Sequence, residues 1–222
     1  MTLKNTWWKI LGAILILYVS VAGLIGNVPR LAILNETIRN VYFHVPLWFA
    51  MMTLMTISMV KSFQYLRKGN IELDQSAYAY AHVAFLFGIL GFLTGATWGN
   101  YTWGSPLPID PKLIAVEIGM LIYAAYFILR GSFDDEQKKA RLSAVYNIFA
   151  YAAFMPLVWI LPRITASLHP GNGGNPAFGQ YDMDNEMRMV FYPAVIGWTL
   201  IGLWISNLKF RIKKIEHAKL EK

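Results

Sequence analysis

The chain has 222 residues, of which 56% are hydrophobic and 15% charged, and its formal net charge is +7. Soluble globular domains carry about 25% charged residues, so this composition excludes an ordinary soluble domain. Cysteine is absent, which excludes disulfides, cysteine-ligated metal and thiol redox chemistry by this chain alone.

Six apolar runs approach the ~20 residues that a helix needs to cross a bilayer. Backbone polar groups in lipid must be paired within their own segment, so the predicted fold class is an all-α bundle of six transmembrane helices. In the third span, Gly91 and Gly95 form a G-x-x-x-G pair, which predicts close packing against a neighbouring helix. The first run has no small-residue cleavage site after it, which indicates that it is not a cleavable signal peptide. We expect spans at about residues 7–26, 41–63, 77–97, 113–130, 144–161 and 189–208, in one membrane domain of residues 1–222 that ends in a basic tail, residues 209–222.

The basic residues predict the orientation of the bundle. An even number of spans puts both termini on one side of the membrane. Five of the 20 lysines and arginines fall on the opposite side, and the other fifteen fall on the side of the termini. The positive-inside rule therefore predicts cytoplasmic termini, with outer loops at residues 27–40, 98–112 and 162–188. The positive charge then reflects membrane orientation and not nucleic-acid binding, and the tail is expected to lie near anionic headgroups.

The segment between the third and fourth spans has an unusual composition. Residues 97–110 read T-W-G-N-Y-T-W-G-S-P-L-P-I-D, with Asp110 as their only formal charge. Gly and Pro favour a helix break, so we expect a loop here. Its aromatic side chains suit the boundary between lipid and water, and two interpretations remain open. The loop is either a floor for a flat apolar ligand or an aromatic belt that anchors two helix ends.

Two of the four histidines fall on the predicted outer side. His44 lies one turn into the second span and His169 in the third outer loop, whereas His82 and His217 fall near the inner side and are interpreted as structural. An interfacial histidine often only satisfies a hydrogen bond. Two histidines beside an aromatic segment also suit haem, whose iron takes two axial imidazoles. Zinc is disfavoured because it needs at least three clustered protein ligands. The candidate guanidinium partners for the haem propionates are Arg30, Arg39, Arg163 and Arg188.

The order and spacing of several motifs resemble those of a known family. From Trp7 to Trp204 the chain resembles the CcmC group of haem-handling membrane proteins (haem exporter protein C), which act in cytochrome c maturation. This group belongs to a wider superfamily with a tryptophan-rich outer signature, which also includes CcsA-type proteins. The matching motifs are Val41-Tyr-Phe-His-Val-Pro-Leu-Trp48, Trp98-Gly99 with Trp103-Gly104, Asp110-Pro-Lys-Leu113, Leu168-His-Pro170 and Asp184-Asn-Glu-Met-Arg188.

The resemblance implies a bacterial inner-membrane protein that binds haem b transiently at its periplasmic face and presents it to a periplasmic haem chaperone. It also implies a partner ABC-type complex with a nucleotide-binding subunit, a second membrane subunit and a small single-span protein. The chain has no G-x-x-x-x-G-K-[ST] motif, so a partner would use any ATP, and we do not expect an enzyme. By this resemblance His44 and His169 are the axial ligands of the iron. The full set of candidate haem-contacting residues is His44, His169, Trp98, Tyr101, Trp103, Asp110, Arg163 and Arg188.

The chain departs from the family pattern after the second Trp-Gly. Members usually continue with a tryptophan-rich run that ends in Trp-Asp, whereas this chain has Ser105-Pro-Leu-Pro-Ile109 before Asp110. The segment before Leu168 also lacks the expected aromatic residues. We therefore expect a reduced aromatic platform around the haem.

Two acidic residues near this segment need interpretation. Asp110 before Pro111 is a good start signal for a helix, so we expect mainly a capping role and predict that Asp110→Asn preserves haem content. Glu117 lies about one turn inside the fourth span. It either has a functional role, as acids within a span often do, or lies close enough to the interface to be hydrated or paired.

Three other functions remain open. A transport subunit for haem or another small molecule would need polar residues in the middle of several spans, and the chain has few. An electron-transfer cytochrome b would place histidine pairs on both sides of the membrane, and His82 alone makes a poor inner pair. A structural subunit would use its aromatic residues only as anchors.

Overall fold

A computed structural model of the chain describes residues 6–31, 33–169 and 183–220. Six helical segments in these ranges are long and apolar enough to cross a membrane, which confirms the expected all-α fold with six spans. Several helices extend beyond the predicted spans, and α7 continues through most of the predicted tail. The elements are α1 (Trp7–Ile25), the 3₁₀ turn η2 (Asn35–Asn40), α2 (Val41–Lys68), α3 (Ile71–Trp103), α4 (Pro111–Gly131), α5 (Glu136–Met155), the π-helical turn η3 (Pro156–Ile160), α6 (Leu161–Ile164) and α7 (Asn185–Leu220).

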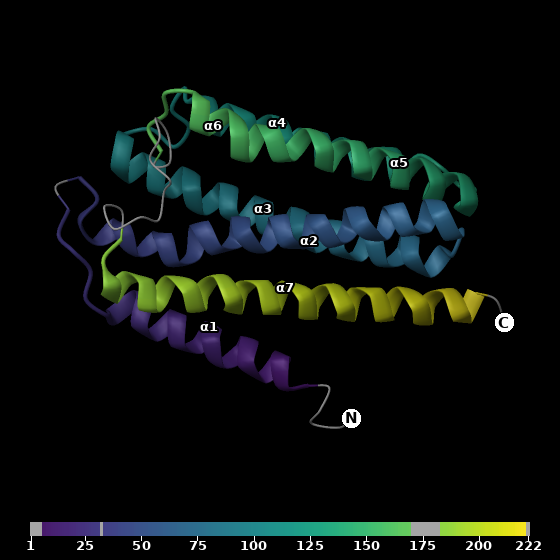
Figure 1. Ribbon diagram of the computed structural model, residues 1–222, viewed down its shortest axis with the longest axis horizontal. Helices are drawn as coiled ribbons and strands as arrows, with labels where there is room; N and C mark the ends of the chain where they lie inside the picture. The colour runs from purple at the N-terminus through teal and green to yellow at the C-terminus, as the bar shows by residue number, and fades with distance from the viewer. Residues whose placement is uncertain (1–5, 32, 170–182, 221–222) are drawn as a thin grey trace.

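The long helices pack in three layers of two (Figure 1). α2 and α3 form the middle layer, α4 and α5 cover one side of it, and α1 and α7 cover the other. α5 packs on α2, while α4 scarcely contacts α3 directly. The α4–α5 hairpin is therefore joined to the bundle mainly through α5. Following the predicted orientation, we call the end that holds the α3–α4 connection the outer end and the opposite end the inner end.

Local sequence signals explain where the middle helices end. Gly69 and Gly104 follow α2 and α3 in the left-handed conformation, with φ of 66° and 72°. Glycine adopts this conformation without steric strain and commonly terminates helices in this way. Asn70 caps the start of α3 by accepting a hydrogen bond from the Glu72 N–H at 2.9 Å.

The loop expected at residues 97–110 is wrong over its first half. α3 continues to Trp103, so only residues 104–110 connect it to α4. A glycine inside a helix costs only about 1 kcal/mol relative to alanine, and Gly99 lies in a crowded place. A Cβ added there would be 3.2 Å from Ser105 O and 3.3 Å from the Trp103 ring. The helix α3 therefore continues past Gly99 and ends at Gly104.

The middle of the bundle between α2, α3, α4 and α5 is closely packed. Fully buried side chains fill it, among them Met51, Leu54, Tyr123 and Phe154. This core separates the outer end, where His44 lies, from the inner end.

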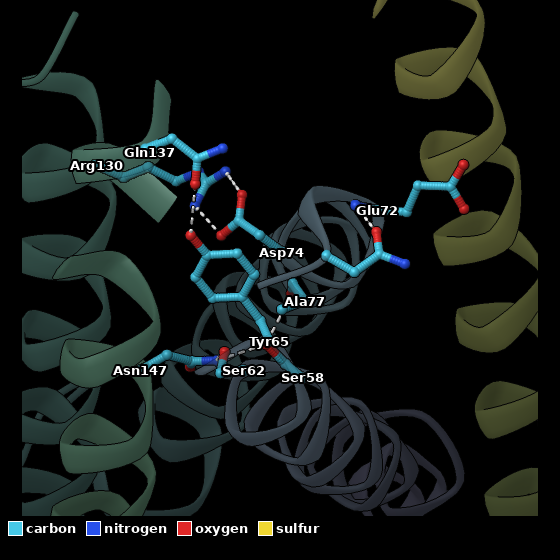
Figure 2. A network of polar contacts seen from close by, with 10 residues as sticks. Ser58, Ser62, Tyr65, Glu72, Asp74, Ala77, Arg130, Gln137 and Asn147 are labelled. Atoms are coloured by element: carbon cyan, nitrogen blue, oxygen red, sulfur yellow. Dashed lines mark hydrogen bonds and ion pairs between the residues drawn. The ribbon is translucent and has the colours of Figure 1, made fainter. Parts of the chain in front are cut away.

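A polar network connects the layers at the inner end (Figure 2). Arg130 of α4 donates two hydrogen bonds to Asp74 of α3, with Nη1–Oδ1 at 2.8 Å and Nη2–Oδ2 at 2.5 Å. Asn147 of α5 donates to Ser58 and Ser62 of α2, both at 2.8 Å. The network ties α4 to α3 and α5 to α2 through specific side-chain pairs.

Candidate functional site

The outer end of the bundle contains a cavity of about 510 Å³. This volume falls within the range of about 300–1,000 Å³ that is typical of small-molecule sites. Residues of α2, α3, α4 and η3 form its walls, together with parts of the connections before α2 and after α6. His44 and His169, which lie far apart in the sequence, both line this cavity.

The His44 imidazole has a defined orientation in the cavity wall. Its Nδ1 lies 2.9 Å from the Gly91 carbonyl oxygen and 3.2 Å from Thr94 Oγ1. A carbonyl oxygen can only accept, so Nδ1 carries the proton and the neutral ring keeps its lone pair on Nε2. Trp48 and Trp98 flank the ring edge-on, with ring centroids 6.2 Å and 5.9 Å away. His44 therefore offers Nε2 as a metal-ligating atom.

His169 lies on the connection that follows α6. Its ring centroid is 4.7 Å from that of Trp103, and its Nδ1 is 3.6 Å from Asp110 Oδ1. Burial and, to a smaller extent, the positive charge of Lys112 lower the pKa of His169 to about 4, although Asp110 partly opposes this shift. His169 is therefore neutral near physiological pH and keeps a lone pair that can bind a metal.

Asp110 holds two parts of the site together. Its Oδ1 accepts hydrogen bonds from the Lys112 N–H at 2.9 Å and Ser167 Oγ at 3.0 Å, and its Oδ2 accepts from the Leu168 N–H at 2.7 Å. Burial alone would raise the pKa of Asp110, but these hydrogen bonds lower it below its usual value. The expected capping of α4 is confirmed. The same carboxylate also fixes the segment that carries His169.

Four tryptophans surround the cavity: Trp48, Trp98, Trp103 and Trp159. Trp98 is held in place because its Nε1 donates to Thr37 Oγ1 at 3.2 Å. Trp98 and Trp103 were predicted from the sequence, whereas Trp48 and Trp159 were not. Trp48 follows His44 by one helical turn, a spacing that puts both on one face of α2, whereas no signal in the sequence relates Trp159 to the site. The cavity is therefore lined by two more indoles than the sequence predicted.

Tyr101 lies apart from the cavity, although it was predicted to contact the ligand. Because α3 stays helical to Trp103, positions 95, 98, 99, 102 and 103 share the face that lines the cavity. Tyr101 falls on another face and its side chain is 71% exposed. The geometry therefore gives no support to Tyr101 as a haem contact.

The cavity wall is positively charged. Lys112 and Arg163 line it, and none of the lining residues that the structure describes is acidic. The Arg163 guanidinium lies 4.3 Å above the Trp159 ring, and its Nη1 donates to the Trp159 carbonyl at 2.6 Å. The sequence did not predict Lys112 as part of the site, and it entered only as one of the basic residues that indicate the orientation of the bundle. Such a cavity favours a ligand that is apolar over most of its surface and anionic at one edge.

The other candidate polar residues are placed differently. Arg39 bonds to the Gly26 carbonyl at 2.5 Å and to Glu36 at 2.7 Å, so it ties the end of α1 to η2. Arg30 and Arg188 lie outside the described lining, and so does the half-buried Glu117. Of the four arginines proposed for propionates, the structure brings only Arg163 to the cavity. Residues 170–182 of the third outer loop lie outside the described residues.

Comparison with known proteins identifies the family. Residues 1–221 match the family described as Heme exporter protein C, CcmC. The chain belongs to the CcmC family. This membership confirms the resemblance found in the motifs, and it agrees with the six helices that are long and apolar enough to cross a membrane.

Individual relatives carry two names. The chain is 26% identical over 177 residues to "Heme exporter protein C" of Paracoccus denitrificans, which covers 80% of this chain and 73% of that one. It is 36% identical over 83 residues to "Cytochrome c biogenesis protein CcsA" of a Synechococcus species, and 35% identical over 101 residues to the CcsA protein of Welwitschia mirabilis. These matches span only 27% and 31% of the two CcsA proteins, so the likeness to them is local.

Proposed function

We propose that this chain binds haem in the outer cavity, with His44 and His169 as axial ligands, and presents it to a periplasmic haem chaperone during cytochrome c biogenesis. The observation that carries the proposal is that two imidazoles from distant parts of the chain line one aromatic cavity. The names of the relatives, which refer to haem export and to cytochrome c biogenesis, agree with this ligand and this process.

The residues present fit haem in three respects. Haem supplies a flat apolar ring, an iron with two axial positions and two anionic propionates. The chain supplies four indoles for the ring and a neutral imidazole with a lone pair at each histidine. Lys112 and Arg163 supply the positive charge that the propionates require.

The chain's own work is to bind, orient and release its ligand, so the proposed function is not enzymatic. His44 belongs to the long helix α2, whereas His169 belongs to the connection after α6 and is held there through Asp110. A connecting segment moves with less disturbance to the packing than a spanning helix does. His169 is therefore the ligand that an incoming chaperone displaces first.

The proposal includes the orientation and the partners implied by the resemblance. The termini lie in the cytoplasm, the cavity faces the periplasm of a bacterial inner membrane, and an ABC-type complex with a nucleotide-binding subunit, a second membrane subunit and a small single-span protein acts beside the chain. A role as a transport subunit with its own path across the bilayer has less support. The core around Met51, Leu54 and Phe154 fills the described middle of the bundle, where such a path would run.

The visible absorption spectrum of the purified protein with added haem tests the proposal. We expect the wild type to show a Soret band with sharp low-spin features, and His44→Ala and His169→Ala to lose these features with at least ~10-fold weaker binding. His82→Ala is the matched control, since His82 is exposed on α3 outside the described cavity wall, and it should behave as the wild type. A wild type that binds no haem, or a spectrum that neither outer histidine affects, would show that the proposal is wrong.

A further inference from the structure

The glycine pair on α3 lies directly against two side chains of the cavity wall. A Cβ added to Gly95 would be 2.6 Å from His44 Cε1, and one added to Gly91 would be 2.9 Å from Trp48 Cε2. The two glycines are one turn apart on α3, and His44 and Trp48 are one turn apart on α2. The G-x-x-x-G pair therefore does more than let two helices approach. It leaves the space in which the imidazole and the indole approach the backbone of α3 closely.

This close approach determines which nitrogen of His44 carries the proton. Only with the ring against α3 does Nδ1 reach the Gly91 carbonyl oxygen at 2.9 Å. Thr94 Oγ1 lies 3.2 Å from the same nitrogen, and its single proton is within reach of both the Leu90 carbonyl at 2.9 Å and the Gly91 carbonyl at 3.0 Å. Metal-ligating histidines commonly donate their second N–H to a backbone carbonyl, which orients the ring and raises its basicity.

We propose that Gly95 is a positioning residue for ligand binding at His44. With the Gly91 carbonyl it forms a seat that holds the imidazole in its Nδ1-protonated form and keeps Nε2 as the ligating atom. This role rests on the proposed function, because it concerns how His44 meets haem. Gly95 itself has no side chain and acts only through the ring that it accommodates.

Haem titration of Gly95→Ala tests the seat. We expect binding about 10-fold to 100-fold weaker than in the wild type, the range found when groups that orient a metal ligand are lost, together with loss of the low-spin spectrum. Gly88→Ala makes the same substitution two turns away on α3. The three atoms nearest to its Cβ would belong to the ends of Met120 and Met51, at 2.7–2.9 Å, and methionine side chains are flexible enough to adapt. Gly88→Ala should bind haem as the wild type does, and a normal Gly95→Ala protein would overturn the proposal.

A double variant separates positioning from general packing. If Gly95 acts through the His44 ring, adding Gly95→Ala to His44→Ala should weaken haem binding no further, because the two changes remove the same interaction. If Gly95→Ala weakens haem binding in the His44→Ala background as much as it does in the wild type, Gly95 acts by a route that does not involve the His44 ring. That result would also overturn the seat.

The tautomer of His44 is measurable without any ligand and without a variant at Gly95. In ¹⁵N-histidine NMR spectra of the wild type, with the signal assigned by comparison with His44→Gln, we expect protonated Nδ1 and unprotonated Nε2. The opposite tautomer would overturn the seat even if haem binds. A wild type that binds no haem overturns the proposed function and this role with it. A wild type whose haem spectrum depends on His44 but is unchanged by Gly95→Ala overturns the seat alone.

Discussion

Asp110 uses both of its carboxylate oxygens to join the start of α4 to the segment that carries His169. An asparagine at this position keeps one acceptor oxygen. Its NH₂ group replaces the other carboxylate oxygen and cannot accept the hydrogen bonds that this oxygen accepts. Leaving one buried donor unsatisfied costs about 1–3 kcal/mol. We therefore expect Asp110→Asn to lower the thermal stability and to weaken haem retention, in contrast to the unchanged haem content that the sequence predicted. Thermal unfolding and haem titration of the same preparation measure both effects.

Asp135→Asn is a matched control for this prediction. Asp135 caps α5 by accepting from the Lys138 N–H at 2.6 Å, but it is exposed and lies at the inner end. The control should lose some stability and keep its haem affinity. If Asp110→Asn also keeps its haem affinity, Asp110 serves only as a helix cap.

Individual side chains show how far the sequence predicts the site. His44, His169, Trp98 and Trp103 all line the cavity, because each belongs to a local pattern whose outer position follows from the order of the spans. Tyr101 was misplaced because the glycines around it favoured a loop, while the helical spacing of its neighbours was the stronger signal. Arg163 was also predicted from its outer position, whereas Trp159 of η3 and Lys112 of α4 reach the cavity through the packing of their helices. Contacts of that kind depend on tertiary structure and have no local pattern.

The ion pair between Arg130 and Asp74 links α4 to α3 at the inner end. Both side chains are largely buried, at 12% and 4% exposed. Removing one partner of a buried pair leaves an uncompensated charge and costs about 3–5 kcal/mol. We expect Arg130→Met to destabilise the bundle by this amount, as measured by unfolding in detergent, and to leave haem affinity unchanged because the core separates the two ends.

The double variant Asp74→Leu with Arg130→Met tests the physical reason. Replacing both charges by apolar groups removes the uncompensated carboxylate, so most of the lost stability should return. A double variant as unstable as Arg130→Met alone would mean that packing by Arg130, whose guanidinium lies 4.7 Å from the Tyr78 ring, matters more than its charge.

The helices themselves were predicted in number but not in length. An apolar window marks only the part of a helix that crosses the hydrocarbon. A helix continues through polar residues until a stop signal, as α3 does from Ile71 to the left-handed Gly104. The π-helical turn at Pro156–Ile160, which connects α5 to α6 and carries Trp159, begins at a proline that interrupts the helical hydrogen bonds, a signal that an apolar window does not register.

The orientation of the whole molecule remains a prediction from its basic residues, and the absence of cysteine makes it directly testable. A single cysteine at Ile109, which is 95% exposed in the α3–α4 connection, should react with a membrane-impermeant maleimide from the periplasmic side. A single cysteine at Asp134, in the α4–α5 connection, should react only after the inner membrane is permeabilised. The reverse pattern would place the cavity in the cytoplasm and rule out delivery to a periplasmic chaperone.

The helical end of α3 has a kinetic consequence. Trp98 and Trp103 belong to a continuous helix, so their backbone is already ordered before a ligand arrives. Ordering a flexible segment costs about 1–2 kcal/mol per residue, and this wall of the cavity avoids that loss. A wall that does not close over its ligand also needs no opening step to release it. The release of a ligand past this wall should therefore depend on how often the receiving protein collides with the chain and competes for the ligand. The rate of ligand transfer should then rise in proportion to the concentration of the receiving protein.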